Sequence, residues 1–367
     1  MNKILTCIVS FIVICLSFVF IILPDKTFSD NENRMLQMMP EFSFRELINL
    51  KYIDRLEDYF NDQFPLRDLF MKIKTMVYKG MNIKDIDGVY FSTDGYLLER
   101  YNKPVNNDKI IKAINRFSDN SNASISLMLI PNAISIYSEK LPKNAFSFNQ
   151  MDTVRYIYDN IGLDNEIDVY DTYIENKDKY QLYYKTDHHY TLYGAYLAYV
   201  EYCKANNLSY KTLEEYKVEL VSDKFVGSLA SRVTDYKDVF DNIWIVNKDI
   251  DVNVWYEDTD KTTNSLYNFD YLNKKDKYAV FLDNNHPLIV IKNNDNNNTN
   301  KLLVIKDSYA NSMIPFLIDN YSEIHVVDPR YYRRSISDYM NNNNIDNALI
   351  LYNLNTMDTE GGLVGIR

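Results

Sequence analysis

The strongest constraint on this 367-residue chain is an uncharged run from Ile4 to Leu23. A helix of that length rises about 30 Å, which matches the hydrocarbon core of a bilayer. The run ends in Ile21-Ile22-Leu23-Pro24 without a small-residue cleavage pattern, so residues 1–26 are expected to form an uncleaved signal anchor, a transmembrane helix. Lys3 before the run and the acidic stretch Asp30 to Glu32 after it place the rest of the chain outside the cytoplasm.

Composition excludes some partners and leaves others open. A net charge of −11 and a pI near 5.0 argue against nucleic acid, which needs a basic face. The cysteines are Cys7, Cys15 and Cys203, and they form neither a disulfide framework nor a CxxC metal motif. The 32 tyrosines fit a sugar-stacking surface, because a phenol ring has an apolar face and a polar tip. They fit a compositional bias of the genome equally well.

Residues 27–104 are expected to form a helical stalk followed by a hairpin. Apolar residues recur at helical spacing after Pro40, and Pro65 fits the first turn of a second helix. Short apolar strands at 88–91 and 96–98 flank a Thr-Asp-Gly turn, which is typical of a hairpin.

Residues 105–367 alternate between helical and strand patterns. Helices are expected at 109–117 and 151–161, and strands at 125–130, 167–170, 302–305, 324–327 and 348–351. This alternation predicts an α/β domain with a central, mostly parallel sheet flanked by helices. Residues 210–300 are irregular and are expected to be an insertion with β structure that ends in a hairpin of the runs 278–282 and 287–291.

The segment Asp187-His188-His189 holds two of the four histidines of the chain beside a carboxylate. A neighbouring carboxylate orients an imidazole and stabilises its charged form, so acid/base chemistry and a metal site are both open. A third interpretation is that Thr186 or Asp187 only caps the helix expected from about residue 190. We expect no metal and no cofactor, since a tight metal site takes three or four ligands and only two other histidines remain.

A second polar segment follows the buried strand 302–305. The strand leads directly into Asp307-Ser308, which puts Ser308 at the carboxyl end of a parallel strand, where open α/β sheets bind ligands. A serine at this point also serves as a helix cap, and that interpretation stays open. Asn132 follows the first strand of the sheet, and Arg330 and Tyr331 follow the strand 324–327.

Taken in order, five short patches resemble the DHHW protein family, which is related to the SGNH-hydrolase-like domains of the alginate O-acetyltransferases AlgJ and AlgX. The patches are Glu32-Asn33-Arg34 with Pro40, Asp62-Gln63-Phe64-Pro65-Leu66-Arg67, Pro131-Asn132 with Tyr137 and Leu141-Pro142, Thr186-Asp187-His188-His189, and Asp307-Ser308-Tyr309. The resemblance covers nearly everything after the anchor. Tyr190 stands where the family usually has Trp.

The resemblance implies an SGNH-hydrolase-like domain with a catalytic triad of Ser308, His189 and Asp187. In these roles Ser308 is the nucleophile, His189 the general base and Asp187 the group that orients the imidazole. Backbone amides of Ser308 and Tyr309 are the first candidates for stabilising the oxyanion. Side-chain donors and substrate contacts are sought among Asn132, Gly227-Ser228, Asn311, Tyr309, Arg330 and Tyr331.

The expected function is an extracytoplasmic, membrane-anchored O-acetyltransferase that acts on a cell-surface or secreted polysaccharide. A separate membrane-bound O-acyltransferase is the expected partner that supplies acetyl. A carbohydrate acetylesterase of the SGNH type shares every named residue and remains an alternative. A non-catalytic glycan-binding or scaffold subunit is a second alternative, and it predicts that the three triad residues do not converge.

Overall fold

The computed structural model describes residues 2–29, 34–163, 165–233, 236, 239–359 and 363–366. The chain divides into a smaller unit, Met1–Asp87 with Ala230–Tyr236, and a larger unit, Gly88–Leu229 with Lys237–Arg367. This division comes earlier than the boundary expected at residue 104, because Tyr90 and Leu98 of the hairpin are buried in the core of the larger unit. The acidic stretch Asp30 to Glu32 and the family patch residue Asn33 lie outside the described residues.

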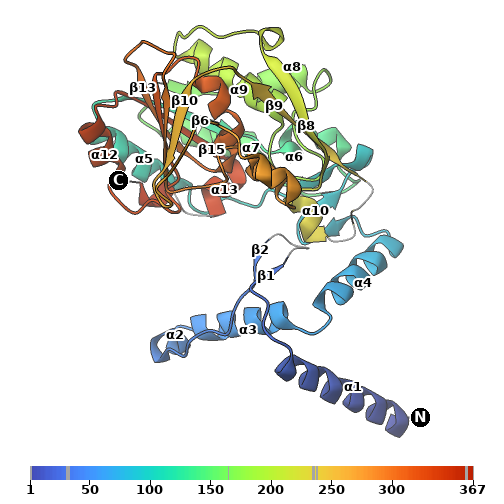
Figure 1. The fold of residues 1–367 in the computed structure, drawn as a ribbon. Helices are drawn as coiled ribbons and strands as arrows, with labels where there is room; N and C mark the ends of the chain where they lie inside the picture. The colour runs from blue at the N-terminus through green and yellow to red at the C-terminus, as the bar shows by residue number, and fades with distance from the viewer. Residues whose placement is uncertain are drawn as a thin grey trace. The chain divides into compact units, whose positions relative to one another are not determined.

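The smaller unit contains the expected helices (Figure 1). They are α1 (Asn2–Ile22), α2 (Phe44–Ile48), α3 (Lys51–Gln63) and α4 (Arg67–Gly80), with a short antiparallel pair of strands, β1 (Phe28–Ser29) and β2 (Arg34–Met35). Within the described residues, Lys3–Ile22 of α1 is long and apolar enough to cross a membrane. Pro65 lies just before α4 and Leu66 forms its N-cap, so the proline precedes the helix start instead of lying in the first turn, where it was expected.

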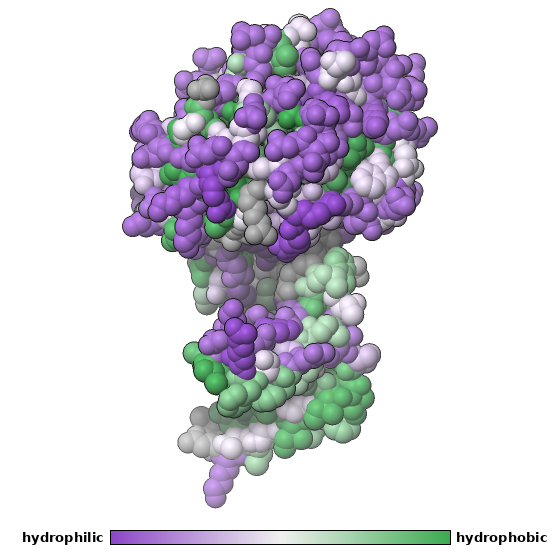
Figure 2. Space-filling view, turned by 90° about the vertical axis from the view of Figure 1, so that its left-hand side faces the viewer, coloured by the Kyte–Doolittle hydropathy of each residue, from purple (hydrophilic) through white to green (hydrophobic). Residues whose placement is uncertain are grey.

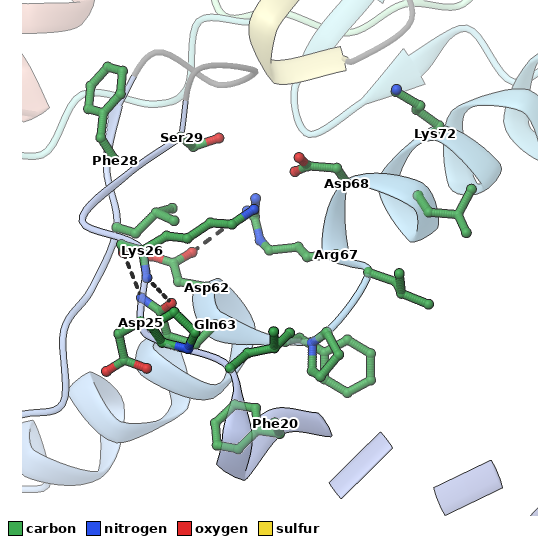
Figure 3. A pocket seen from close by; sticks show the side chains of 17 residues that line it. Phe20, Asp25, Lys26, Phe28, Ser29, Asp62, Gln63, Arg67, Asp68 and Lys72 are labelled. Carbon is green, nitrogen blue, oxygen red and sulfur yellow. Dashed lines mark hydrogen bonds and ion pairs between the residues drawn. The ribbon is translucent and has the colours of Figure 1, made fainter. Parts of the chain in front are cut away.

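A cavity of about 690 Å³ lies in the smaller unit beside the end of α1 (Figure 3). Gln63 closes one side of it, accepting a hydrogen bond from the Lys26 amide at 2.9 Å and donating one to the Lys26 carbonyl at 3.0 Å. Asp62 accepts from the Gln37 amide at 2.8 Å and pairs with Arg67 at 3.6 Å. These bonds fasten the chain that leaves α1 to the end of α3.

The larger unit is built on a mixed sheet. Within the described residues its strand order is β11-β10-β12-β14-β13-β15-β6-β7. The pairs β14-β13, β13-β15, β15-β6 and β6-β7 are parallel. The bounds are β6 (Ser124–Ile130), β7 (Asn165–Ile167), β10 (Val252–Tyr256), β11 (Lys261–Thr263), β12 (Leu288–Asn293), β13 (Lys301–Lys306), β14 (Glu323–Val327) and β15 (Asn347–Asn353). The mostly parallel sheet predicted from the sequence is therefore confirmed.

Helices cover both faces of this sheet, as the alternation predicted. Leu302 and Val304 of β13 point into one hydrophobic cluster, which includes α9 (Leu192–Ala205) and α11 (Ile314–Leu317). Leu303 and Ile305 point into the other, which includes α5 (Asn107–Asp119), α7 (Gln150–Tyr158) and α12 (Ile336–Asn343). A strand buried on both faces reads as a continuous apolar run, which is what these residues show. Shorter helices of this unit are α6 (Ala133–Ile136) and α13 (Leu354–Thr359), whereas α10 (Ser228–Val233) begins in the larger unit and belongs to the smaller one from Ala230 on.

The insertion differs from its expected form. The run 278–282 is not a strand, because Lys277–Val280 forms a 3₁₀ turn whose apolar side chains are buried in a small separate cluster. The run 287–291 does form β12, but β12 pairs antiparallel with β10 and β14, which extends the main sheet. Strands β8 (Lys217–Phe225) and β9 (Asp241–Asn247) form a separate antiparallel pair.

In the larger unit the structure corrects one expected strand and confirms the expected hairpin. The strand expected at 167–170 ends at Ile167, because Tyr170 begins α8 (Tyr170–Asn176). The hairpin expected near residue 90 is present as β4 (Val89–Phe91) and β5 (Leu97–Glu99), which pair antiparallel.

Tyrosine rings fill much of the interior. The largest fully buried side chains are ten tyrosines and two phenylalanines. The tyrosines are Tyr101, Tyr173, Tyr183, Tyr184, Tyr190, Tyr199, Tyr202, Tyr256, Tyr309 and Tyr352. A buried ring offers no face to a sugar, so for these residues the idea of a stacking surface is wrong. Their phenol groups serve the core instead, as large apolar bodies whose hydroxyls need partners.

Candidate active site

The serine predicted as nucleophile lies where β13 ends. Asp307, the next residue after β13, is the N-cap of a 3₁₀ turn over Ser308–Ser312 and accepts a hydrogen bond from the Tyr309 amide at 2.8 Å. The capping role considered for Ser308 thus belongs to Asp307, which leaves the Ser308 hydroxyl unengaged by the turn. Ser308 therefore stands at the carboxyl end of a central parallel strand, the edge at which open α/β sheets bind ligands.

The Asp187-His189 pair lies in the turn that precedes α9. Tyr183 and Tyr190 form an isolated antiparallel bridge on either side of this turn. Thr191 caps α9 through the Tyr193 amide, so the alternative that Thr186 or Asp187 caps the helix is wrong. The two residues are therefore free to act elsewhere.

The three residues converge in one line of hydrogen bonds. Asp187 Oδ1 lies 2.6 Å from His189 Nδ1, and His189 Nε2 lies 2.7 Å from Ser308 Oγ. Asp187 Oδ1 also accepts from the His189 amide at 2.9 Å, which fixes the aspartate relative to the ring it faces. This order of carboxylate, imidazole and hydroxyl is the geometry of an activated serine.

The segment around Gly227 holds the carboxylate in place. Asp187 Oδ2 accepts a hydrogen bond from the Ser228 amide at 2.7 Å. A Cβ at Gly227 would lie 2.2 Å from the Asp187 Cβ and 2.4 Å from its Oδ2, so only glycine permits this approach. The Gly227 amide donates to Thr186 Oγ1 at 3.0 Å, and Thr186 in turn donates to the buried Asp241 at 2.6 Å. The amides of Gly227 and Ser228 are thus engaged in holding the Thr186-Asp187 segment and are not available to a substrate.

Tyr278 holds the imidazole from its other side. Its ring stacks on His189 with centroids 3.7 Å apart and 11° between the planes. Its hydroxyl donates to the Ser308 carbonyl at 3.1 Å and lies 3.1 Å from Ser312 Oγ. Sequence reasoning missed this residue, because Tyr278 lies in a segment expected to be a strand and carries no motif of its own.

Burial and neighbouring charges set the protonation of the pair. Burial opposes ionisation of Asp187, but the two imidazoles and the hydrogen bonds from His189 and Ser228 outweigh it and hold the pKa of the carboxyl well below its usual range. Burial, together with repulsion from His188, lowers the pKa of His189 to about 4 against the pull of Asp187. At neutral pH the site then holds an aspartate anion and a neutral imidazole, which is the state a general base requires.

His188 stands beside the pair with a different set of contacts. Its Nδ1 lies 2.6 Å from Ser228 Oγ and 3.7 Å from Asp187 Oδ1. Asp187, His188 and His189 each offer an atom to a metal within 4.8 Å of the others. These three residues would supply three ligands to a metal. A metal bound there would compete with the hydrogen bond between Asp187 and His189.

Two residues predicted to contact substrate are interior residues. Tyr309 is fully buried, and its hydroxyl donates to the His188 carbonyl. Asn132 donates to the Tyr309 hydroxyl at 3.2 Å and to Asn353 Oδ1 at 3.2 Å, and it accepts from Gln150 at 2.8 Å. Neither side chain faces solvent, so neither can be the direct substrate contact sought among these residues. Asn132 instead holds the Tyr309 hydroxyl, and Tyr309 holds the backbone of His188 beside the catalytic imidazole.

Arg330 and Tyr331 follow β14, as expected, and differ in exposure. Arg330 donates to both carboxylate oxygens of the buried Asp328, at 2.8 and 2.6 Å, so its guanidinium has a structural partner inside the protein. Its charge still acts on the site, since it contributes to the lowered pKa of His189. Tyr331 is 51% exposed beside it, with the Arg330 guanidinium 5.5 Å from the ring centroid.

Asn311 and the buried Lys306 share Asn285 as a hydrogen-bond partner. Asn311 donates to the Asn284 carbonyl and to Asn285 Oδ1, both at 3.3 Å, and within the described residues its own Oδ1 has no hydrogen-bond partner. Lys306 is fully buried, donates to Asn285 Oδ1 at 2.7 Å and lies 3.9 Å from Asp328. Sequence reasoning missed Lys306, because a lysine at the end of a buried strand gives no signal of its own.

These features define the class of the protein: an α/β protein with a Ser-His-Asp arrangement at the carboxyl edge of a mostly parallel sheet. The chain belongs to the DHHW protein family, whose family model, described as DHHW protein, matches residues 84–327. The resemblance inferred from the sequence is thus confirmed. No match to a curated protein is found.

Three solved structures are similar to this chain, and the first two share its fold. A DHHW family protein from Eubacterium siraeum matches with a TM-score of 0.69 and 22% identity, over 77% of this chain and 96% of that one. PatB1 from Bacillus cereus, solved with a sulfonyl adduct, matches with a TM-score of 0.64 and 20% identity, over 76% of this chain and 98% of that one. The O-acetyltransferase domain of Pseudomonas putida AlgJ matches with a TM-score of 0.46 and 13% identity, over 74% of this chain and 92% of that one.

Proposed function

We propose that this chain is a membrane-anchored, extracytoplasmic O-acetyltransferase that modifies a cell-surface or secreted polysaccharide through an acetyl-serine intermediate. The observation that carries the proposal is the unbroken line from Asp187 through His189 to Ser308, with contacts of 2.6 and 2.7 Å. A scaffold or glycan-binding subunit has no need for this alignment. The choice of acetyl and of a polysaccharide acceptor rests on the family resemblance read from the sequence.

In the first half-reaction, Ser308 Oγ attacks the carbonyl carbon of an acetyl ester. His189 Nε2 takes the hydroxyl proton as the C–O bond forms, and Asp187 stabilises the resulting imidazolium. Collapse of the tetrahedral intermediate breaks the bond to the donor oxygen, which leaves with the proton from His189. The product is an acetyl ester on Ser308 and a free donor hydroxyl.

In the second half-reaction, a sugar hydroxyl replaces the donor. His189 removes its proton, the sugar oxygen attacks the acetyl carbonyl, and Ser308 leaves with the proton returned by His189. Water in place of the sugar gives the acetylesterase reaction with the same residues. The acceptor therefore decides between the two activities.

The oxyanion of both intermediates needs a donor close to Ser308. The Tyr309 amide is occupied by Asp307, which removes one of the two amides considered from the sequence. Within the described residues the Ser308 amide has no acceptor, so it is the remaining backbone candidate. The Arg330 charge nearby adds a positive potential that favours an anion.

The expected supply of acetyl is a separate membrane-bound O-acyltransferase. The span Lys3–Ile22 supports this arrangement, since it would hold the domain beside such a partner and beside a growing glycan. The chain itself offers no nucleotide-binding loop that would recognise a soluble activated donor.

The proposal is tested with the full chain in detergent micelles. The wild type and Ser308→Ala are incubated with p-nitrophenyl acetate, with and without candidate oligosaccharides, and acetate and acetylated sugar are quantified by mass spectrometry. We expect turnover in the wild type alone, an acetyl adduct on Ser308, and transfer to a sugar. Equal turnover in both proteins would rule out the serine mechanism, and acetate release without any acetylated sugar would favour the esterase.

A further inference from the structure

An exposed apolar surface occupies the smaller unit where α3 meets α4. It consists of five side chains that are each 41–61% exposed, and we call it the elbow: Phe60, Phe64, Leu66, Leu69 and Phe70. Figure 2 shows hydrophobic side chains gathered over the visible face of this unit. Soluble surfaces rarely leave large apolar side chains clustered without a partner.

The backbone holds one of these side chains outward at a cost. Leu66 is the N-cap of α4 and has a φ of 61°, in the left-handed region that residues other than glycine rarely adopt. It is also the most exposed residue of the elbow, at 61%. Strained conformations tend to persist where function requires them, and here the strain places a leucine on the surface.

Contacts between aromatic rings hold the elbow beside the last turn of α1. The Phe20 ring lies 5.5 Å from the Phe60 ring and 5.8 Å from the Tyr59 ring. Phe64 and Phe70 are joined by an edge contact at 5.8 Å. Phe20 is in the last turn of the span Lys3–Ile22, so it lies within about 5 Å of the end of that span along the helix axis.

We propose that the elbow inserts into the outer boundary of the lipid bilayer, as a second membrane contact beside α1. This inference rests on the proposed anchoring by α1, because the end of the span sets the boundary at the level of Phe20. Interfacial helices bury an apolar face by roughly 5–10 Å between headgroups and acyl chains. The elbow presents such a face at that level.

Apolar burial, rather than charge, drives the insertion. The cations Arg67 and Lys72 near the elbow are accompanied by acidic side chains on α3, including Asp54, Glu57 and Asp58. These opposite charges give the surface no strong preference for anionic lipid. Vesicles of zwitterionic phosphatidylcholine are therefore sufficient for the test.

The test measures depth in the full chain reconstituted into phosphatidylcholine vesicles. Single cysteines carry an environment-sensitive fluorophore in a Cys7→Ala, Cys15→Ala background, and the buried Cys203 is retained. The reporters are Leu66→Cys and Phe70→Cys. The matched controls are Asp58→Cys, on the polar face of α3 two residues before Phe60, and Lys79→Cys, an exposed position nine residues after Phe70 and therefore on the opposite side of α4.

We expect lipids with a nitroxide near the headgroup to quench both reporters at least about twofold more than both controls. Equal quenching at all four positions would overturn the proposal. Quenching that needs no nitroxide and rises with the protein-to-lipid ratio would also overturn it, in favour of contact between copies of the chain. Reporters that respond only when a second membrane protein is added would do the same in favour of a protein partner.

Two further readouts separate this inference from the proposed function. A fluorophore on the native Cys15, in a Cys7→Ala background, reports whether α1 itself enters the bilayer. No quenching there by a nitroxide near the acyl-chain end would overturn the anchoring and the elbow together, whereas quenching there without a response at the elbow would overturn the elbow alone. Labelling of Ser308 by a sulfonyl fluoride, measured on the same samples, tests the catalytic proposal independently and also shows that each variant is folded.

Discussion

The Tyr278 ring lies parallel to the His189 imidazole, with 3.7 Å between the centroids and 11° between the planes. Asp187 restrains one edge of the imidazole and Tyr278 restrains one face. The same tyrosine bonds to the carbonyl of Ser308, so it positions the base and the nucleophile together. Tyr278 is thus a positioning residue on which the alignment of both groups depends.

Substitution of Tyr278 separates the two contributions. Tyr278→Phe keeps the stacked ring and loses hydrogen bonds worth about 1 kcal/mol, so we expect the rate of Ser308 sulfonylation to fall by less than about tenfold. Tyr278→Leu removes the stack as well, and we expect a fall of roughly 10- to 100-fold together with a changed pH profile. Rates of labelling by a sulfonyl fluoride measure both. A Tyr278→Leu protein that reacts like the wild type would contradict the positioning role.

The pH profile should report the low pKa of His189. The imidazole acts as a base only when neutral, so labelling of Ser308 should hold steady at neutral pH and fall as the pH drops through about 4. Repulsion from His188 contributes to this low value, so His188→Asn should raise the pKa of His189 and move the acid limb upward. Labelling rates between pH 3 and 8, at about half-unit steps, give the midpoint. An unmoved limb in the variant would show that His188 does not contribute to the low pKa of His189.

Gly227 should tolerate no side chain. A methyl group there would overlap Asp187, so Gly227→Ala must displace the carboxylate that orients His189. We expect at least a tenfold loss of Ser308 labelling and a loss of about 1–3 kcal/mol in the free energy of unfolding. Gly162→Ala is the matched control in the same unit, since its nearest neighbour would lie at 3.8 Å. Equal activity and stability in the two variants would contradict this account.

Lys306 should make stability rise with pH in the alkaline range. Burial lowers its pKa from 10.5 to about 8, so between these values the unfolded chain holds a proton that the folded protein has lost. More protons on the unfolded state mean that the free energy of unfolding increases with pH, here by about 3 kcal/mol in all. This gain should be absent in Lys306→Met and retained in the exposed control Lys143→Met.

The measurement is the free energy of unfolding of the full chain, obtained from urea titrations between pH 7 and 10.5. The fluorescence of Trp244 and Trp255, both in the larger unit, monitors the unfolding of that unit. The informative quantity is the difference between wild type and variant at each pH, because other groups that titrate there contribute equally to both. A difference that does not change with pH would mean that Lys306 carries no depressed pKa.

The parallel core could be predicted from the sequence because its strands are buried on both faces. Residues 302–305 read as an unbroken apolar run, and the runs 125–130 and 324–327 are each interrupted by one buried polar residue, Ser126 or His325. The insertion followed no such rule. Residues 278–282 read as an apolar run like that of a buried strand, yet Lys277–Val280 forms a 3₁₀ turn, and Tyr278, Val280 and Phe281 enter a small cluster.

The site was predictable only in its reacting groups. Asp187, His189 and Ser308 carry distinctive chemistry and lie at the ends of recognisable elements. The groups that hold them are ordinary residues far away in the sequence, such as Ser228, whose amide reaches Asp187 from 41 positions on. Tyr309 shows the converse, because nothing in the sequence tells whether an aromatic ring beside a nucleophile points into the core or toward solvent.

An interior rich in tyrosine constrains the native state in a way that an aliphatic core does not. A leucine needs only space, whereas a buried phenol is also stabilised when its hydroxyl meets a partner; within the described residues the hydroxyls of Tyr184 and Tyr190 have none. Tyr173 reaches the Gly194 carbonyl at 2.8 Å, and the hydroxyls of Tyr202 and Tyr321 lie 2.6 Å apart. A near-native packing of the same volume would leave such hydroxyls without partners. The tyrosines whose hydroxyls are bonded in this way therefore favour one arrangement of the core by bond direction as well as by shape.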